Sequence, residues 1–146
     1  MAVNTIPIYS KAGQVGFTTT ALTAANTARD GTGTVATIFT AGSDGGRVER
    51  VRVTADGTNV ATVLRIFINN GGATSTATNN VLYAEMTLPA TTASAVAALA
   101  TQELPNTVDS TAFPLVLPAG YKLTATIGTA VATGVRITAI GSTYTA

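Results

Sequence analysis

The sequence contains no histidine, no cysteine and no tryptophan. Without histidine the chain lacks the commonest general base and metal ligand at neutral pH. A Ser-His-Asp triad, a Cys-His dyad, disulfides and thiolate metal sites are all excluded. These absences predict a protein that is not an enzyme and that holds no cofactor and no metal.

Charge is scarce as well. Lys, Arg, Asp and Glu make up 10% of the 146 residues, against about 25% in typical soluble proteins. The net charge of +1 gives no long-range field to attract DNA, RNA or anionic lipid. Because so few charges protect a surface poorly against self-association, we expect partners, including further copies of the chain, to cover it. Nucleic acid and membranes are not among the expected partners.

Targeting and membrane-spanning signals are missing from the sequence. The first five residues have neither the basic nor the apolar region of a signal peptide. The longest uncharged stretch, residues 66–84, is interrupted by asparagine and glycine. We therefore expect no transmembrane segment.

What the chain does contain is short β-type segments separated by turn signals, the pattern of a sandwich or barrel. Threonine, which suits a pleated and half-buried surface, is frequent in them. The pattern predicts a single all-β domain over residues 13–146, an antiparallel β-sandwich of seven to eight strands. Residues 1–12 are expected to form an extended N-terminal arm, because Pro7 and the nearby glycines disfavour a helix. The expected strands cover residues 15–20, 33–40, 47–54, 60–69, 81–88, 121–127 and 134–140.

Two of these segments carry detailed predictions. Residues 60–69 alternate with apolar side chains on both faces, which predicts a central strand with Arg65 near an edge or interface. Its two faces are expected to carry Leu64, Ile66 and Ile68 on one side and Val63, Arg65 and Phe67 on the other. In residues 47–54, Val48 breaks the alternation of Val51 and Val53, which indicates a β-bulge or a later strand start.

Connections between the strands are marked by three Asp-Gly pairs, which favour turns with positive φ. They are Asp30-Gly31, Asp44-Gly45 and Asp56-Gly57. No carboxylate cluster follows them, so we interpret them as turns rather than calcium loops. Residues 91–101 stay open: alanine favours a helix, whereas frequent Thr and Ser and the lack of charged ends favour a strand or irregular loop.

Few residues qualify as catalytic candidates. Glu85 and Glu103 are the best carboxylate pair for glycoside hydrolysis, but the chain has no tryptophan to form a sugar platform. Residues 31–36 match Gly-x-Gly-x-x-Ala, but an Asp-Gly turn precedes the match and a strand is expected to follow it. Neither pattern alters the prediction of a non-enzyme.

The basic residues Arg47, Arg50 and Arg52, with Arg65 further along, form the densest charge cluster. A nucleic-acid site would need more positive charge and interleaved aromatic residues. Arginine is favoured at protein interfaces because its planar guanidinium pairs with carboxylates in a bidentate way. These four arginines are therefore expected on a solvated strand face or at a subunit interface.

Several short segments follow one another in an order that resembles that in small virion structural proteins of tailed bacteriophages. The resemblance is in particular to jelly-roll-like capsid decoration (cement) proteins. These segments are residues 34–42, 47–53, 64–70, 82–89 and 117–123, and the resemblance as a whole covers roughly residues 30–140. The resemblance implies a jelly-roll-like sandwich, often trimeric, that binds the major capsid protein on the outer capsid surface and secures the shell. It implies no catalytic residues.

Two other functions remain open from the sequence. One is a tail, neck or fibre component of a virion, and the other is a carbohydrate-binding or adhesin β-sandwich. A sugar-binding module would favour exposed aromatic residues, and this chain has only four Tyr and four Phe. The strand order also stays open, because jelly-roll and immunoglobulin-like sandwiches share this spacing of strands.

Overall fold

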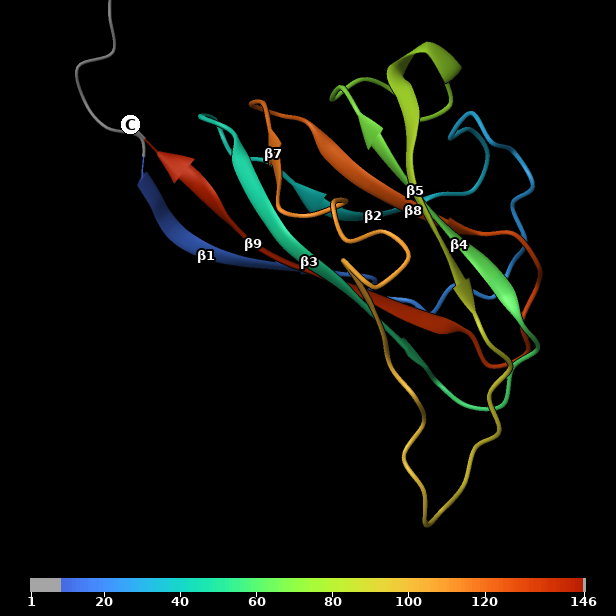
Figure 1. Cartoon of the computed structure of the whole chain (residues 1–146). Helices are drawn as coiled ribbons and strands as arrows, with labels where there is room; N and C mark the ends of the chain where they lie inside the picture. Colours follow the sequence, from blue (N-terminus) through green and yellow to red (C-terminus); the bar gives the residue numbers. More distant parts are fainter. Residues whose placement is uncertain (1–8, 146) are drawn as a thin grey trace, which may run out of the picture.

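A computed structural model of the chain describes residues 9–145, and the described part consists of nine β-strands with no α-helix (Figure 1). A single 3-10 turn, η1, covers Ala77–Asn79. The strands are β1 (Tyr9–Phe17), β2 (Ala36–Thr40), β3 (Gly46–Ala55), β4 (Thr62–Asn69), β5 (Asn80–Leu88), β6 (Gln102–Leu104), β7 (Leu115–Leu117), β8 (Lys122–Ile127) and β9 (Val135–Thr145).

The nine strands form two antiparallel sheets. Sheet A has the order β1-β9-β3-β6, with the short strand β7 also paired to β3, and sheet B has the order β2-β8-β4-β5. The pairs β4–β5, β3–β6, β2–β8 and β1–β9 describe one long antiparallel hairpin that is rolled into two layers. This arrangement is a jelly roll. The expected all-β, antiparallel sandwich is therefore confirmed, and the strand order that the sequence left open is that of the jelly roll.

Several strand boundaries differ from the predicted ones. β1 begins at Tyr9, so the last four residues of the expected arm belong to a strand that pairs with β9. Residues 1–8 of that arm lie outside the described residues. The strand expected at residues 15–20 is the end of β1, which stops at Phe17. Strand pairing with the distant C-terminal segment, rather than local propensity, places this boundary.

Strands β6 and β7 raise the count to nine, above the predicted seven to eight. Each has three residues and pairs with a different half of β3, in a region where proline is frequent. Segments this short leave no periodic pattern in the sequence. Residues 91–101, for which helix, strand and loop were open, form an irregular loop apart from one bridge between Asn59 and Thr91.

The detailed strand predictions hold in part. β4 lies between β8 and β5 as expected, but Arg65 therefore sits on a central strand and not at an edge. A register shift falls between Val48 and Arg50 of β3, which confirms the predicted bulge. Of the three Asp-Gly pairs, Gly31 and Gly45 adopt positive φ and Gly57 does not. None of the three joins two strands that pair with each other, because β1 to β4 alternate between the sheets.

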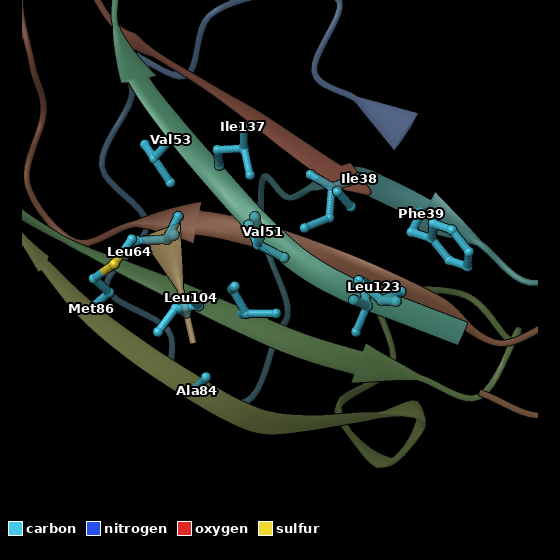
Figure 2. Close-up of a cluster of buried hydrophobic side chains, with 14 of the residues drawn as sticks. Ile38, Phe39, Val51, Val53, Leu64, Ala84, Met86, Leu104, Leu123 and Ile137 are labelled. Atoms are coloured by element: carbon cyan, nitrogen blue, oxygen red, sulfur yellow. The ribbon is translucent and has the colours of Figure 1, made fainter. Parts of the chain in front are cut away.

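The core fills the space between the two sheets, as Figure 2 shows for side chains of both layers. Residues of facing strands from both sheets supply it. The buried side chains from sheet A are Val48, Val51, Val53, Leu104, Leu117, Val135, Ile137 and Ala139. Those from sheet B are Ile38, Phe39, Leu64, Ile66, Ala84, Met86, Leu88, Leu123, Ala125 and Ile127.

Candidate interaction surface

The outer face of sheet B is partly covered by the segment between β1 and β2. The backbone N–H of Asn26 donates to the carbonyl of Ile127 at 2.7 Å, which ties this segment to β8. Phe67 points away from the core and is nevertheless fully buried, in contact range of the turn at Gly31. Figure 1 shows the segment on the sheet B side of the molecule. The chain itself therefore covers the part of this face around Phe67, whereas Glu85 and Thr87 of β5 stay exposed.

The outer face of sheet A, in contrast, exposes apolar side chains. Val15 is 58% exposed and Phe17 is 59% exposed, and both lie on β1. Ile140 of β9 is the cross-strand neighbour of Val15 and is half-buried. We call these three residues the apolar strip and the outer face of sheet A the open face. Exposed apolar side chains that adjoin one another on a sheet are typical of a surface that another molecule covers.

Three of the four predicted arginines lie on this open face, all on β3. Arg47 Nε lies 2.8 Å from Glu49 Oε1, although without the alignment of a hydrogen bond. Arg52 Nε lies 3.6 Å from Glu103 Oε1 on the adjacent strand β6. Both pairs are solvent-exposed and so add little stability. The two carboxylates do neutralise most of the positive charge of the arginine cluster on β3.

Arg50 is the exception on the open face. It is exposed and directly opposite Ile140, which places it at the end of the apolar strip. Within the described part of the chain, no carboxylate lies within ion-pair distance of its guanidinium. The open face therefore presents an apolar strip next to one positive charge that has no counterion among the described residues.

Arg65 lies apart from the other three arginines, on the outer side of sheet B. Its side chain is only 13% exposed; Nε lies 2.9 Å from Glu85 Oε1, and Nη1 donates to the carbonyl oxygen of Asn26 at 3.0 Å. Arg29 binds the other carboxylate oxygen of Glu85 at 2.8 Å. Hydrogen bonds from Arg29 and Arg65 hold the pKa of Glu85 below its ordinary value. The predicted four-arginine cluster is therefore divided between opposite faces, and Arg65 ties the covering segment to its own sheet.

The structure does not bring the candidate carboxylates together. Glu85 lies on β5 of sheet B and Glu103 on β6 of sheet A, each beside arginine. The Gly-x-Gly-x-x-Ala match runs from a loop into β2, with no helix following it.

No group of three or more Asp and Glu that could hold a metal occurs among the described residues. No helix in that part of the chain is long and apolar enough to cross a membrane.

Hollows in the molecule are small or shallow. An apolar cavity of about 20 Å³ lies at one end of the core, bordered by Val53, Leu88 and Val135. This volume fits about one water molecule. The other hollows are open surface depressions, such as the one of about 180 Å³ between β1 and β2 beside Gln14. The open face is consequently the most distinctive surface that the structure describes.

Two loops also present apolar tips that the sequence did not single out. Val96 is 97% exposed in the β5–β6 loop, which projects from the body of the molecule (Figure 1). Val108 is 93% exposed in the β6–β7 loop.

The sequence signal that could have found Val15 and Phe17 is their alternation with Gly16 on β1, where the glycine faces inward against β2.

Comparisons of the chain with protein-family models, with curated proteins and with solved structures found no match.

Proposed function

We propose that this protein is a virion structural protein, specifically a capsid decoration (cement) protein. In this proposal it binds the shell of the major capsid protein from outside and stabilises it. It acts there as a homo-oligomer, with a trimer favoured, and uses neither nucleic acid nor a membrane as a partner. The single observation that carries the proposal is the open face, where Val15 and Phe17 are exposed and Ile140, the neighbour of Val15, lies opposite Arg50.

The two outer faces of the sandwich differ in a way that favours a partner on one of them. The chain's own segment covers part of the outer face of sheet B, whereas the outer face of sheet A exposes apolar side chains to solvent. Burying apolar surface contributes about 25 cal/mol per Å², so a partner that covers the open face is favoured. A rigid sandwich that uses such a face as a contact can act as a clamp between shell subunits.

The fold and the sequence resemblance add independent support. Jelly rolls occur in viral capsid proteins and in lectins, so the fold agrees with the proposal but does not select it. The order of short segments along the sequence resembles that in phage decoration proteins. An oligomer also multiplies weak contacts, because several copies held together bind a repeating shell with an avidity above that of one copy.

Electron microscopy of virions labelled with gold-conjugated antibody against this chain would test the proposal directly. We expect label over the outer capsid surface of virions from the phage that encodes the chain. Label confined to the tail, neck or fibres would replace it with the second virion role. If intact virions carry no label but disrupted virions are found to contain the chain, the chain lies inside the particle. That result would overturn an outer decoration role.

A binding assay would show whether the open face is the contact. Purified chain is mixed with expanded shells of the major capsid protein and sedimented, alongside a Phe17→Asp variant. We expect the wild type to sediment with the shells and the variant to stay in the supernatant. A Val81→Asp variant is the matched control, because Val81 is 57% exposed on the edge strand β5 of the other sheet.

The carbohydrate-binding alternative has one observation in its favour. Phe17 is an exposed aromatic ring on a sheet face, and aromatic rings are common platforms for sugars. A glycan array probed with the chain separates the two functions. Specific glycan binding that the Phe17→Asp change abolishes, without any shell binding, would favour the adhesin function.

A further inference from the structure

A hollow of about 210 Å³ lies at one end of sheet B, beside the connection between β4 and β5. Ile68 of β4 and Val81 of β5 are cross-strand neighbours that line it, together with Tyr121, which directly precedes β8. Ile68 and Tyr121 also pack against the core. The other lining residues are Asn70, Thr78, Asn79 and Asn80. None of the seven lining residues is charged, so the hollow combines apolar carbon with a rim of amides and hydroxyls.

Hydrogen bonds within the chain hold this rim in one arrangement. Asn69 Nδ2 donates to Asn80 Oδ1 at 2.8 Å. One residue further along the connection from each strand, Asn70 Nδ2 donates to Asn79 Oδ1 at 3.3 Å. Asn79 Nδ2 in turn donates to the carbonyl oxygen of Ala73 at 3.0 Å. Because these amides are already fixed, a ligand that binds them does not have to order them first.

Several polar groups of the rim remain available after these bonds are made. An amide nitrogen carries two hydrogens, and Asn70 and Asn79 each use one of theirs within the described residues. The hydroxyls of Thr78 and Tyr121 form no hydrogen bond within the described part of the chain. The hollow therefore offers two amide donors and two hydroxyls, each of which both donates and accepts.

These groups match the surface of a neutral sugar. A sugar ring has a face of C–H bonds, which packs against apolar and aromatic side chains, and a rim of hydroxyls that form hydrogen bonds with fixed polar groups. A charged ligand would find no counterion among the lining residues. The volume of about 210 Å³ corresponds to about seven water molecules, which suits a single sugar ring.

We propose that this hollow is a binding site for a neutral sugar. The Tyr121 ring packs against the C–H face of the sugar, and the amides of Asn70 and Asn79 with the Thr78 hydroxyl bind its hydroxyl groups. The site is distinct from the open face, because it belongs to sheet B and the open face belongs to sheet A. The inference therefore goes beyond the proposed function: a chain held on a shell through its open face would also bind glycans.

NMR titration of the isotope-labelled chain with glucose, galactose, mannose and N-acetylglucosamine tests the site. We expect saturable shifts of the backbone amide signals of residues 68–81 and 121 with at least one sugar. The Kd should be on the order of 1 mM, because a single ring makes few contacts. Tyr121→Leu removes the aromatic ring but keeps an apolar side chain, and Thr78→Val removes a hydroxyl from an exposed residue. Each change should raise the Kd at least about threefold.

Two further variants separate this site from other surfaces. Thr76→Val makes the same change at an exposed threonine that does not line the hollow, and it should leave the Kd unchanged. Phe17→Asp alters the open face and should also leave the Kd unchanged. The amide spectra confirm that each variant is folded.

Three results would each overturn the inference. They are the lack of a saturable shift with any of the four sugars, shifts confined to the open face, and equal effects of Thr76→Val and Thr78→Val on the Kd. Immunogold labelling of virions is unaffected by these results, so the proposed function is judged independently.

Discussion

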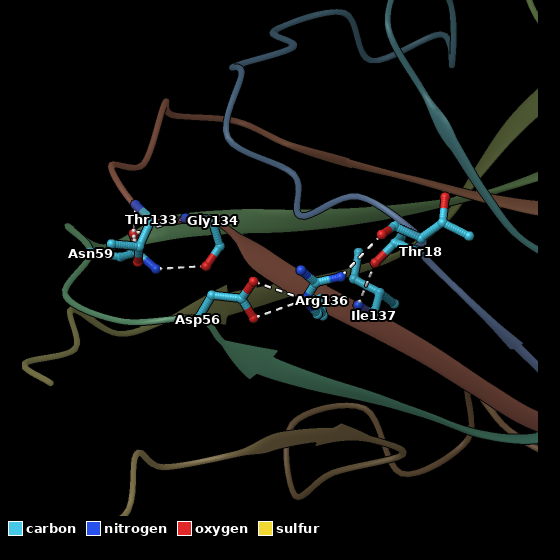
Figure 3. Close-up of polar contacts among 8 residues, drawn as sticks. Thr18, Asp56, Asn59, Thr133, Gly134, Arg136 and Ile137 are labelled. Atoms are coloured by element: carbon cyan, nitrogen blue, oxygen red, sulfur yellow. Dashed lines mark hydrogen bonds and ion pairs between the residues drawn. The ribbon is translucent and has the colours of Figure 1, made fainter. Parts of the chain in front are cut away.

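The side-chain amide of Asn59 is hydrogen-bonded on both sides to the backbone of Gly134, 75 residues further along the chain. Its Nδ2 donates to the Gly134 carbonyl at 2.8 Å, and its Oδ1 accepts from the Gly134 N–H at 3.2 Å (Figure 3). The same oxygen accepts from the N–H of Thr133 at 2.8 Å. This buried amide joins the β3–β4 connection to the start of β9.

Replacing this amide should destabilise the sandwich strongly. Asn59→Ala leaves the N–H groups of Thr133 and Gly134 without their acceptor and leaves the Gly134 carbonyl with the Asp56 N–H as its remaining partner. We expect the free energy of unfolding to fall by about 2–4 kcal/mol. Urea denaturation followed by circular dichroism measures it. The control is Thr133→Val, which removes one hydroxyl from an exposed residue and should cost less than about 1 kcal/mol. Equal losses for both variants would contradict this role of Asn59.

A close approach of β1 to β2 requires glycine at position 16. A Cβ atom on Gly16 would lie 2.0 Å from the carbonyl oxygen of Ile38, so the two strands would have to separate. Gly16→Ala should lower the free energy of unfolding by about 1–3 kcal/mol, as overpacking does. A Cβ atom on Gly13 of the same strand would meet open space within 4 Å, so Gly13→Ala should change stability by less than about 0.5 kcal/mol. Thermal unfolding of both variants distinguishes the positions.

The short strand β6 is held by one deeply buried side chain. Leu104 is fully buried in the core between the sheets (Figure 2). Leu104→Ala should lower the free energy of unfolding by about 2–5 kcal/mol, because it removes apolar contacts and leaves a cavity. Val116→Ala on β7 is the comparison, since Val116 points to solvent and its loss should cost less than about 0.5 kcal/mol. A small effect of Leu104→Ala would mean that β6 contributes little to the fold.

The ion pairs of Glu85 should make stability depend on pH. Arg29 and Arg65 lower its pKa in the folded protein below the ordinary value of 4.5. The unfolded chain therefore binds a proton more readily than the folded one, and the stabilisation is fully present above that ordinary value. It is lost as the pH falls through the lower pKa of the folded state.

Glu85→Gln tests this dependence. The variant should be less stable than the wild type at pH 7, and the difference should shrink as the solution is acidified below the ordinary carboxyl pKa. Denaturant titrations at several pH values measure both curves. Glu103→Gln, which removes a carboxylate with one arginine at 3.6 Å, is the matched variant and should show a smaller difference at pH 7. A constant gap between wild type and Glu85→Gln at all pH values would refute the linkage.

Local patterns predicted the parts of the fold that depend on neighbouring residues. The alternation of Leu64 and Ile66 with Arg65 and Phe67 identified a central strand, because side chains in a strand change face at every residue. The irregular position of Val48 identified the bulge in β3 for the same reason. β6 and β7 escaped prediction, because three residues are too few for a period and their pairing with β3 is a tertiary contact.

The candidate surface was predicted only in outline. The sequence indicated that arginines of β3 belong to a solvated strand face or an interface, but it grouped Arg65 with them. The structure places Arg65 on the other sheet, bound to Glu85 and to the carbonyl of Asn26. Val15 and Phe17 drew no attention in the sequence, since their exposure depends on what covers each sheet. A covering segment comes from elsewhere in the chain and leaves no periodic signal in the strand that it covers.

By itself, the sequence determined the class of the molecule: a low-charge, all-β sandwich whose strands alternate between buried and exposed residues, without histidine or cysteine chemistry. These properties follow from composition and from a period of two, which are local. Only the tertiary structure decided the jelly-roll order, the burial of Phe67 and the isolation of Arg50 beside Ile140. Those features arise from pairing between distant segments, such as Val15 with Ile140, and the partners of such pairs are chosen by the packing of the whole chain.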